Sequence, residues 1–110
     1  MVILPYITKG RYLVLKKNFS NYKKRANIMK AMAHPVRLLI LDHLSKGEMC
    51  VCEINELVSL DQSTVSKHLA VLRNAGIVED EKRGMKVFYT LKTPCVLKYL
   101  DCVEGVIRAN

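Results

Sequence analysis

The sequence predicts a mainly helical domain that carries one small β-hairpin. Apolar residues recur at helical spacing through four segments before Gly76. The period then changes to that of strands on either side of a glycine turn at 82–84. A last helical segment follows Pro94. Helices followed by a two-stranded wing form a winged helix-turn-helix. We expect a dimer, since a chain of 110 residues buries only a modest core by itself.

The first helix is predicted to follow an N-terminal arm. Residues 1–19 mix apolar and basic side chains without a sustained period, so we expect an arm with a short strand at 12–15, ahead of a domain spanning 20–110. From about Ser20 the residues that recur at helical spacing are Tyr22, Ala26, Met29 and Met32 or Ala33. The helix ends at His34, because the residue before a proline is pushed out of the helical region.

Pro35 suits the first position of a second helix, which we expect to run to about Ser45 and to stop at Gly47. Its predicted inward residues are Val36, Leu39, Ile40 and Leu44. Residues 48–51 are short and are expected to be extended. The third helix follows, with its inward residues at Val51, Ile54, Leu57 and Val58.

Asp61 is a strong N-cap for the fourth helix, which Gly76 ends. One face of this helix carries Val65, Leu69, Leu72 and Ala75. Strands are then predicted at 77–81 and 85–91 around the glycine turn. A final helix at 94–109 has an apolar surface broad enough for its own core and a second subunit, made of Val96, Leu97, Leu100, Val103 and Ile107.

The charge balance favours a polyanionic partner. Eighteen Lys and Arg against ten Asp and Glu give a net charge of +8, which suits nucleic acid or an acidic membrane surface, although a merely soluble basic protein is the alternative. No apolar run approaches the roughly 20 residues of a membrane span, and the opening residues lack a secretory signal. We therefore expect a cytoplasmic protein whose four cysteines are reduced thiols, available for metal binding or redox sensing unless they are simply buried.

The fourth helix has the polar front and apolar back that major-groove binding requires. The side chains that we expect to reach bases or phosphates are Gln62, Ser63, Thr64, Ser66, Lys67 and His68. In the wing, Arg83 and Lys86 are the expected DNA contacts, with Lys82 beside them. The alternative for both segments is an ordinary solvated surface.

Cys50 and Cys52 stand at the predicted start of the third helix. Thiolates select thiophilic ions, and two at i and i+2 point the same way only on an extended backbone. In an α-helix they would diverge by about 200°. We therefore expect that binding of one ion by both sulfurs needs an extended or unwound helix start, which would misplace the fourth helix on DNA.

Three motifs in this order resemble the ArsR/SmtB family of metal-responsive repressors: residues 34–41, residues 50–54, and residues 62–69 with Leu72, Ala75 and Gly76. The resemblance covers about residues 20–108. It implies a homodimer that holds double-stranded operator DNA until a metal or metalloid binds. It also implies that the fourth helix reads DNA and that the first and last helices form the dimer interface.

The resemblance also bears on the inducer. Arsenite-sensing members commonly have a third cysteine where this chain has Asn55, and cadmium- and lead-sensing members use arm cysteines, of which none precedes Cys50. The remaining candidate metal ligands are Cys95 and Cys102, two turns apart on one face of the last helix. They complete the first site, form a second site, or are structural. The last helix lacks the histidines of zinc-sensing relatives.

The sequence thus predicts a repressor, not an enzyme, that leaves its operator when As(III) or Sb(III) binds. Cd(II) and Pb(II) are secondary candidates, and no organic cofactor or membrane is expected. One rival within the regulators is a cysteine redox or persulfide switch. A thiol oxidoreductase finds no support in a C-x-x-C motif or a βαβ pattern. A sequence-neutral architectural DNA binder is a third rival.

Overall fold

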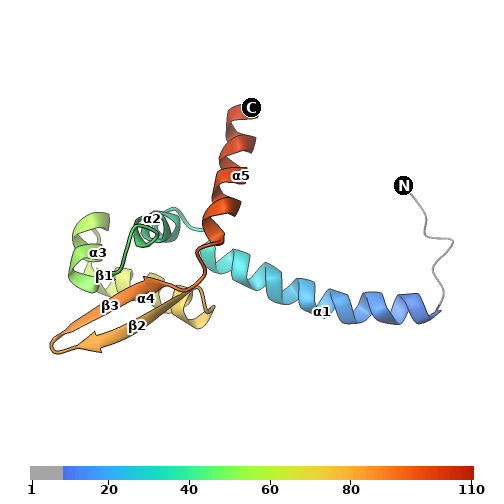
Figure 1. Cartoon of the computed structure of the whole chain (residues 1–110), viewed down its shortest axis with the longest axis horizontal. Helices are drawn as coiled ribbons and strands as arrows, with labels where there is room; N and C mark the ends of the chain where they lie inside the picture. Colours follow the sequence, from blue (N-terminus) through green and yellow to red (C-terminus); the bar gives the residue numbers. More distant parts are fainter. Residues whose placement is uncertain (1–8) are drawn as a thin grey trace.

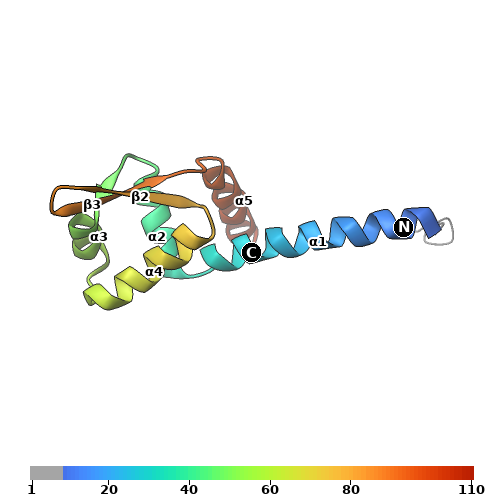
Figure 2. The ribbon, with the colours of Figure 1, turned by 90° about the horizontal axis from the view of Figure 1, so that it is seen from below.

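A computed structural model of the chain describes residues 9–110, with side chains from residue 18 onward. The helices are α1 (Lys9–Met32), α2 (Pro35–Leu44), α3 (Val51–Val58), α4 (Gln62–Asn74) and α5 (Val96–Ala109), and the strands are β1 (Met49–Cys50), β2 (Val78–Arg83) and β3 (Lys86–Leu91). Helices α2, α3 and α4 gather beside the sheet, while α1 and α5 extend away from this body (Figures 1 and 2). The predicted fold class, mainly helical with a small wing, is confirmed.

The sheet is antiparallel, with the order β1-β3-β2. Strands β2 and β3 form the predicted wing, paired from Val78 with Leu91 to Arg83 with Lys86. Gly84 has φ +63° at the tip, a conformation that favours glycine. The segment predicted to be extended near 48–51 supplies β1, which pairs Met49 with Tyr89. This pairing ties the start of α3 to the wing.

Helices α2 and α4 start where the sequence predicts, whereas α5 starts at Val96 and not at Pro94, with Cys95 as its N-cap and no capping bond from a side chain. Pro35 occupies the first turn of α2, and the Nδ1 of His34 accepts a hydrogen bond from the Val36 N–H at 3.1 Å. Asp61 is the N-cap of α4, and its side chain accepts from the Thr64 N–H. These caps fix α2 and α4 at their N-terminal ends.

One hydrophobic core joins the three body helices and the sheet. Its fully buried side chains are Ile40, Leu41, Ile54, Val65, Leu69, Leu72, Ile77 and Val78. The predicted inner face of α4 is confirmed, whereas that of α2 needs a correction. Leu41 is fully buried and Leu39 is 38% exposed. Spacing alone places Leu39 on the inner face, but the buried stripe of α2 turns towards Leu41 because the helix packs on α3, α4 and β3 together.

Helix α1 begins earlier than predicted. It starts at Lys9, not near Ser20, so the short strand predicted at 12–15 is wrong. The apolar residues of 9–19 show no sustained helical period, so their spacing does not mark this part of the helix. Residues 1–8 lie outside the described part, and the division into an arm and a domain at residue 20 stays a prediction.

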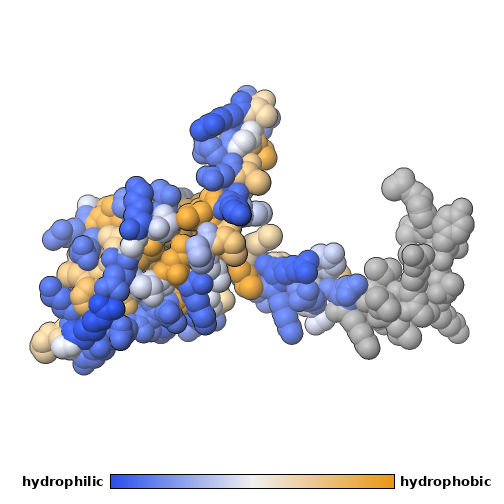
Figure 3. Space-filling model, viewed as in Figure 1, coloured by the Kyte–Doolittle hydropathy of each residue, from blue (hydrophilic) through white to orange (hydrophobic). Residues whose placement is uncertain are grey.

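Helices α1 and α5 leave much apolar surface uncovered. Hydrophobic side chains gather where both helices leave the body and along one side of α5 (Figure 3). On α1 the exposed large side chains are Phe19, Tyr22, Ile28 and Met29, and on α5 they are Tyr99, Val103, Val106 and Ile107. No helix in the described residues is long and apolar enough to cross a membrane.

Candidate functional site

The first turn of α4 is organised around Asp61. Its carboxylate accepts hydrogen bonds from the hydroxyls of Ser63 and Thr64 and from the Thr64 N–H. The bond from the Ser63 hydroxyl, followed by those from Thr64, lowers the pKa of Asp61 from 3.8 to about 2. Ser63 and Thr64 were predicted to contact DNA. Both hydroxyls are engaged in capping the helix instead of standing free.

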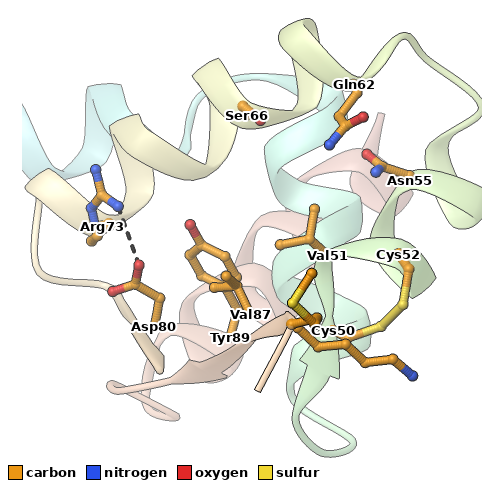
Figure 4. A pocket seen from close by; sticks show the side chains of 12 residues that line it. Cys50, Val51, Cys52, Asn55, Gln62, Ser66, Arg73, Asp80, Val87 and Tyr89 are labelled. Atoms are coloured by element: carbon orange, nitrogen blue, oxygen red, sulfur yellow. Dashed lines mark hydrogen bonds and ion pairs between the residues drawn. A yellow bond between two sulfur atoms is a disulfide. The ribbon is translucent and has the colours of Figure 1, made fainter. Parts of the chain in front are cut away.

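Gln62, Ser66 and Lys67 are exposed on α4. None of their side chains makes a hydrogen bond or ion pair to another of the described residues. Gln62 and Ser66 come from successive turns and lie on the side of α4 that faces the wing (Figure 4). Lys86, at the start of β3, lies on the same hollow and is exposed. These four side chains are free to meet a ligand.

His68, also predicted to bind DNA, points into the body. Its ring lies 4.3 Å from the ring of His34, and its Nδ1 accepts a hydrogen bond from the Nε of Arg37 at 3.2 Å. Arg37 also donates to the carbonyl of Ala31 at 2.8 Å. Partial burial lowers the pKa of His68 below 6.5, and its electrostatic interactions with His34 and the Arg37 guanidinium act in the same direction. His68 thus joins α4 to the junction of α1 and α2.

The predicted wing contacts also differ from each other. Arg83 donates to both carboxylate oxygens of Glu48, at 2.7 and 2.8 Å, and to Glu81 at 2.9 Å. Its guanidinium lies 4.6 Å from the ring centre of Phe88. These bonds, led by that with Glu48, raise the pKa of Arg83. Arg83 is therefore bound within the wing, whereas Lys86 is not.

Cys50 and Cys52 are joined by a disulfide, with their Cα atoms 5.3 Å apart. Cys50 lies outside α3 as its N-cap, with an extended backbone (φ −78°, ψ 159°), and only Cys52 is helical. The predicted divergence of the two thiols in a helix does not apply, because only one of them is inside it. Of the two predicted arrangements, extended or unwound, Cys50 has the extended one, and the two sulfurs meet while α3 stays intact.

Cys50 takes part in a reciprocal capping box. Its sulfur accepts the Glu53 N–H at 3.3 Å, and the Glu53 carboxylate accepts the Cys50 N–H at 2.9 Å. This box resembles the Ser-x-x-Glu pattern of helix starts, with a sulfur in place of the hydroxyl. The Cys-x-x-Glu spacing of Cys50 and Glu53 is the signal in the sequence for this cap. The cap places Cys50 in the body, where it is 3% exposed.

The cysteine pair and the polar face of α4 border one cavity. It has a volume of about 590 Å³ and lies between α3, α4 and the wing (Figure 4). The disulfide lies at one side, Gln62 and Ser66 at another, and the ion pair of Arg73 with Asp80, 3.2 Å between charged atoms, closes the far side. Arg73 and Asp80 gave no signal in the sequence, since their pairing depends on how β2 packs against α4.

Cys95 and Cys102 are exposed free thiols on a different part of the molecule. Cys95 is the N-cap of α5 and borders an apolar groove between α1 and α5. Both views place α5 apart from α3. Among the described residues, no three His, Cys, Asp or Glu side chains come together as a metal site would require. Asn55, at the position of the third thiol of arsenite sensors, lines the cavity beside Cys52.

Comparisons with known proteins agree with the winged helix-turn-helix structure. A model for bacterial regulatory proteins of the arsR family matches residues 34–80, from the start of α2 to the wing. The transcriptional activator HlyU of Vibrio cholerae is 40% identical over 101 residues, which are 92% of this chain and 93% of HlyU. The chain belongs to the ArsR family. It is therefore a helix-turn-helix transcription regulator.

Other ArsR-family relatives differ in what their names say. The arsenic resistance transcriptional regulator ArsR1 of Pseudomonas putida is 44% identical over 66 residues, 59% of this chain and 51% of ArsR1. The structure of reduced HlyU from Vibrio cholerae has a TM-score of 0.69 at 37% identity, over 77% of this chain and 92% of that one. A homodimeric winged helix-turn-helix DNA-binding domain from Mycobacterium bovis has a TM-score of 0.72 at 28% identity, over 84% and 85%. These relatives are regulators, not enzymes.

Proposed function

We propose that this ArsR-family chain is a homodimeric repressor that leaves its operator when the Cys50/Cys52 pair changes state. One observation carries the proposal: the two sulfurs meet at the N-cap of α3, in a cavity that Gln62 and Ser66 of α4 also line. A chemical change at the pair takes place beside side chains that are free to meet DNA. The sensing cysteines and the side chains that contact DNA then line different sides of one cavity.

The DNA surface is formed by α4 and the wing. Free side chains at Gln62, Ser66, Lys67 and Lys86 supply the direct contacts, and the net charge of +8 supplies attraction to phosphates. The other predicted contacts are held by bonds inside the chain: Ser63, Thr64, His68 and Arg83. We assign them to positioning the first group, because they fix the helix start, its packing on α2 and the wing strand.

Helices α1 and α5 form the dimer interface in this proposal. Each leaves apolar side chains exposed, and an apolar groove of about 280 Å³ runs between them, lined by Ile28, Met29 and Tyr99 among others. The related Mycobacterium bovis domain is homodimeric. Two copies would present two α4 helices to a two-fold symmetric operator, as dimeric helix-turn-helix proteins do.

Oxidation of the pair to a disulfide is the change of state that the geometry supports best. The sulfurs come within bonding distance in one chain without disturbing α3, and no third metal-ligating side chain joins them among the described residues. Reduced, the pair is two thiols; oxidised, it is a short bridge between the N-cap and the first turn of α3. The structure of reduced HlyU shows that a relative was obtained in a named redox state.

Binding of As(III) or Sb(III) by the reduced pair is the second candidate. Two thiolates that can meet can also hold one thiophilic ion, and the relative ArsR1 is an arsenic resistance regulator. The donor set is incomplete for a three-thiolate centre, since Asn55 replaces the third cysteine. Cys95 or Cys102 of a second copy, or a thiol from solution, would have to complete it. Cd(II) and Pb(II) need more ligands still.

Operator binding under controlled redox conditions tests both candidates. The operator is first selected from randomised duplexes with the reduced protein, and its affinity is followed by fluorescence anisotropy. The dithiol oxidant diamide is added in one series, and arsenite, antimonite, cadmium, lead or zinc is added to anaerobically reduced protein in another. The proteins are wild type, Cys50→Ser, Cys52→Ser, and Cys95→Ser/Cys102→Ser as the matched control.

We expect diamide to release DNA from wild type and from the Cys95→Ser/Cys102→Ser control, and a dithiol reductant to restore binding. Cys50→Ser and Cys52→Ser cannot form the internal bridge, so diamide should not release DNA from either variant by this route. Release by arsenite without oxidation would favour the second candidate. Normal release of DNA from both single variants, with oxidant and with every ion, would refute the proposed role of the pair.

A further inference from the structure

The two residues of the pair differ in their access to solvent. Cys50 is 3% exposed, whereas Cys52 is exposed. Thiol–disulfide exchange requires a thiolate to attack a disulfide sulfur directly, so access decides which sulfur reacts. A small molecule from solution therefore reacts with Cys52, both when the pair is oxidised and when it is reduced. Cys50 can react with Cys52, which touches it, but not readily with anything larger.

The surroundings of Cys50 suit a leaving group. Its sulfur accepts the Glu53 N–H at 3.3 Å. The N-terminus of a helix favours negative charge because its N–H groups point outward. When an external thiolate attacks the sulfur of Cys52, the negative charge that develops on Cys50 already has a hydrogen-bond donor in place. In both reduction and oxidation, the external thiol or disulfide therefore reacts at Cys52, and Cys50 exchanges only with Cys52.

The cavity beside Cys52 has room for a bound thiol. Its volume of about 590 Å³ is in the range of small-molecule sites. Asn55 borders the cavity beside Cys52. Gln62, Ser66 and Lys86 add polar groups on the opposite walls. A peptide-like thiol attached to Cys52 would therefore find donors and acceptors around it.

We propose that Cys52 is an S-thiolation site for low-molecular-weight disulfides and that Cys50 is its resolving thiol. The Cys52 thiolate attacks a disulfide RSSR; a Cys52–SR bond forms, the S–S bond of the reagent breaks and RS⁻ leaves. The Cys50 thiolate then attacks the Cys52 sulfur and displaces the second RS⁻. The chain loses two electrons and two protons, and RSSR becomes two thiols.

The mixed disulfide has a consequence of its own for DNA binding. It lies between α4 and the wing, next to Gln62 and Ser66, where the DNA backbone would pass. The adduct should therefore block the operator before Cys50 resolves it. This inference rests on the proposed function, since it assumes that the cavity faces DNA.

Glutathione disulfide is the probe for this reaction. Full-length reduced protein in the Cys95→Ser/Cys102→Ser background is mixed with it, and the products are followed by intact mass and peptide mapping, with operator affinity measured on the same samples. The variants add Cys50→Ser or Cys52→Ser. Serine at position 50 keeps an N-cap hydroxyl opposite Glu53, so α3 should still form.

The parent should pass through a glutathione adduct on Cys52 to the internal disulfide, and Cys50→Ser should stop at the adduct with DNA binding lost. Uptake by Cys52→Ser should be slower by roughly tenfold or more, because Cys50 is buried. Equal uptake by Cys52→Ser would overturn the assignment. If an adduct on Cys52 left the operator bound, the cavity would not face DNA and the proposed switch would be refuted. The conclusion that Cys52 reacts before Cys50 would still stand. Limited alkylation of the reduced parent, mapped by peptide, gives the same order without a substitution.

Discussion

The side chain of Asp61 fixes the start of α4, the helix proposed to contact DNA. It accepts three hydrogen bonds from Ser63 and Thr64, and these bonds hold the first turn of α4 in place. They are stronger to the ionised carboxylate than to the protonated one, which is why the pKa of Asp61 falls to about 2. Gln62, next to the cap, keeps a free side chain because its neighbours supply the capping bonds.

Replacing Asp61 by alanine should destabilise the fold in a pH-dependent way. The folded-state pKa is lowered from 3.8, so the stabilisation is complete above pH 3.8 and is lost as the pH falls towards 2. We expect Asp61→Ala to lower the midpoint of thermal unfolding by roughly 4 °C at neutral pH. Calorimetry between neutral and acid pH should show the gap from wild type closing below pH 3.8.

Ser63→Ala serves as the matched control, because it removes one of the three bonds and leaves the carboxylate. It should cause a smaller change with the same dependence on pH. A gap between Asp61→Ala and wild type that stays constant down to pH 2 would contradict the role given to the charge.

His68 and Lys67 are neighbours in α4 with opposite surroundings. Lys67 is exposed, whereas His68 packs on His34 and accepts a bond from Arg37. A helix turns by about 100° per residue, so adjacent polar residues can face solvent and core in turn. Composition alone therefore assigns His68 to the DNA surface, and only the packing of α4 on α2 separates the two.

The wing is the element in which local bonds decide which charges are free. Arg83 at the end of β2 is bound by Glu48 and Glu81, and Lys86 at the start of β3 is not. The two residues face each other across the hairpin. The pair of Arg83 with Glu48 ties the wing to the segment before β1, and thus to the start of α3. Lys86 is left to act on a ligand.

Lys86→Ala should weaken operator binding more than Arg83→Ala does. Loss of a phosphate contact lowers the slope of log affinity against log salt by about one, and we expect that change for Lys86. Arg83→Ala leaves the slope nearly unchanged, since its charge is already paired with carboxylates. Anisotropy titrations at several salt concentrations measure both slopes. Equal losses of slope would mean that Arg83 exchanges its partners for phosphate on DNA.

The elements were predictable from sequence where a local signal marks them. Pro35, Asp61 and Gly84 each impose a backbone conformation, and α2, α4 and the wing begin or turn at these residues. Helix α1 was not predictable over residues 9–19, because the apolar residues of this stretch show no sustained helical spacing in the sequence. Long-range partners were equally out of reach: nothing near Arg83 in the sequence points to Glu48.

The cysteine pair was predictable only in part. The sequence identified both residues, and the extended backbone needed at the first of them was expected. What it did not give was that Cys50 is a cap outside α3, so that the helix remains whole when the sulfurs meet. The third ligand that the family resemblance led us to look for is also missing from the described residues. A disulfide needs only these two sulfurs, whereas an ion held by three thiolates needs a further ligand.

At the scale of the whole molecule, the body has its own core, and α1 and α5 do not share fully in it. No residue of α5 is fully buried, although the helix is strongly amphipathic. Val103 borders a small apolar hollow with Met29, Met32 and Leu38. Uncovered apolar surface of this kind on two neighbouring helices is typical of an interface between subunits. The reading helices of two copies would then be coupled through α5.

A lysine at Val103 should separate the subunits. Burying an unpaired ammonium in an apolar interface is costly, so we expect Val103→Lys to weaken dimerisation by roughly tenfold or more. Asp101→Lys is the matched control, since it puts the same group on α5 outside the apolar set. Sedimentation equilibrium gives the dimer constant. Operator affinity should fall with it, because two linked reading helices bind more tightly than one. Unchanged dimerisation of Val103→Lys would place the interface on another surface.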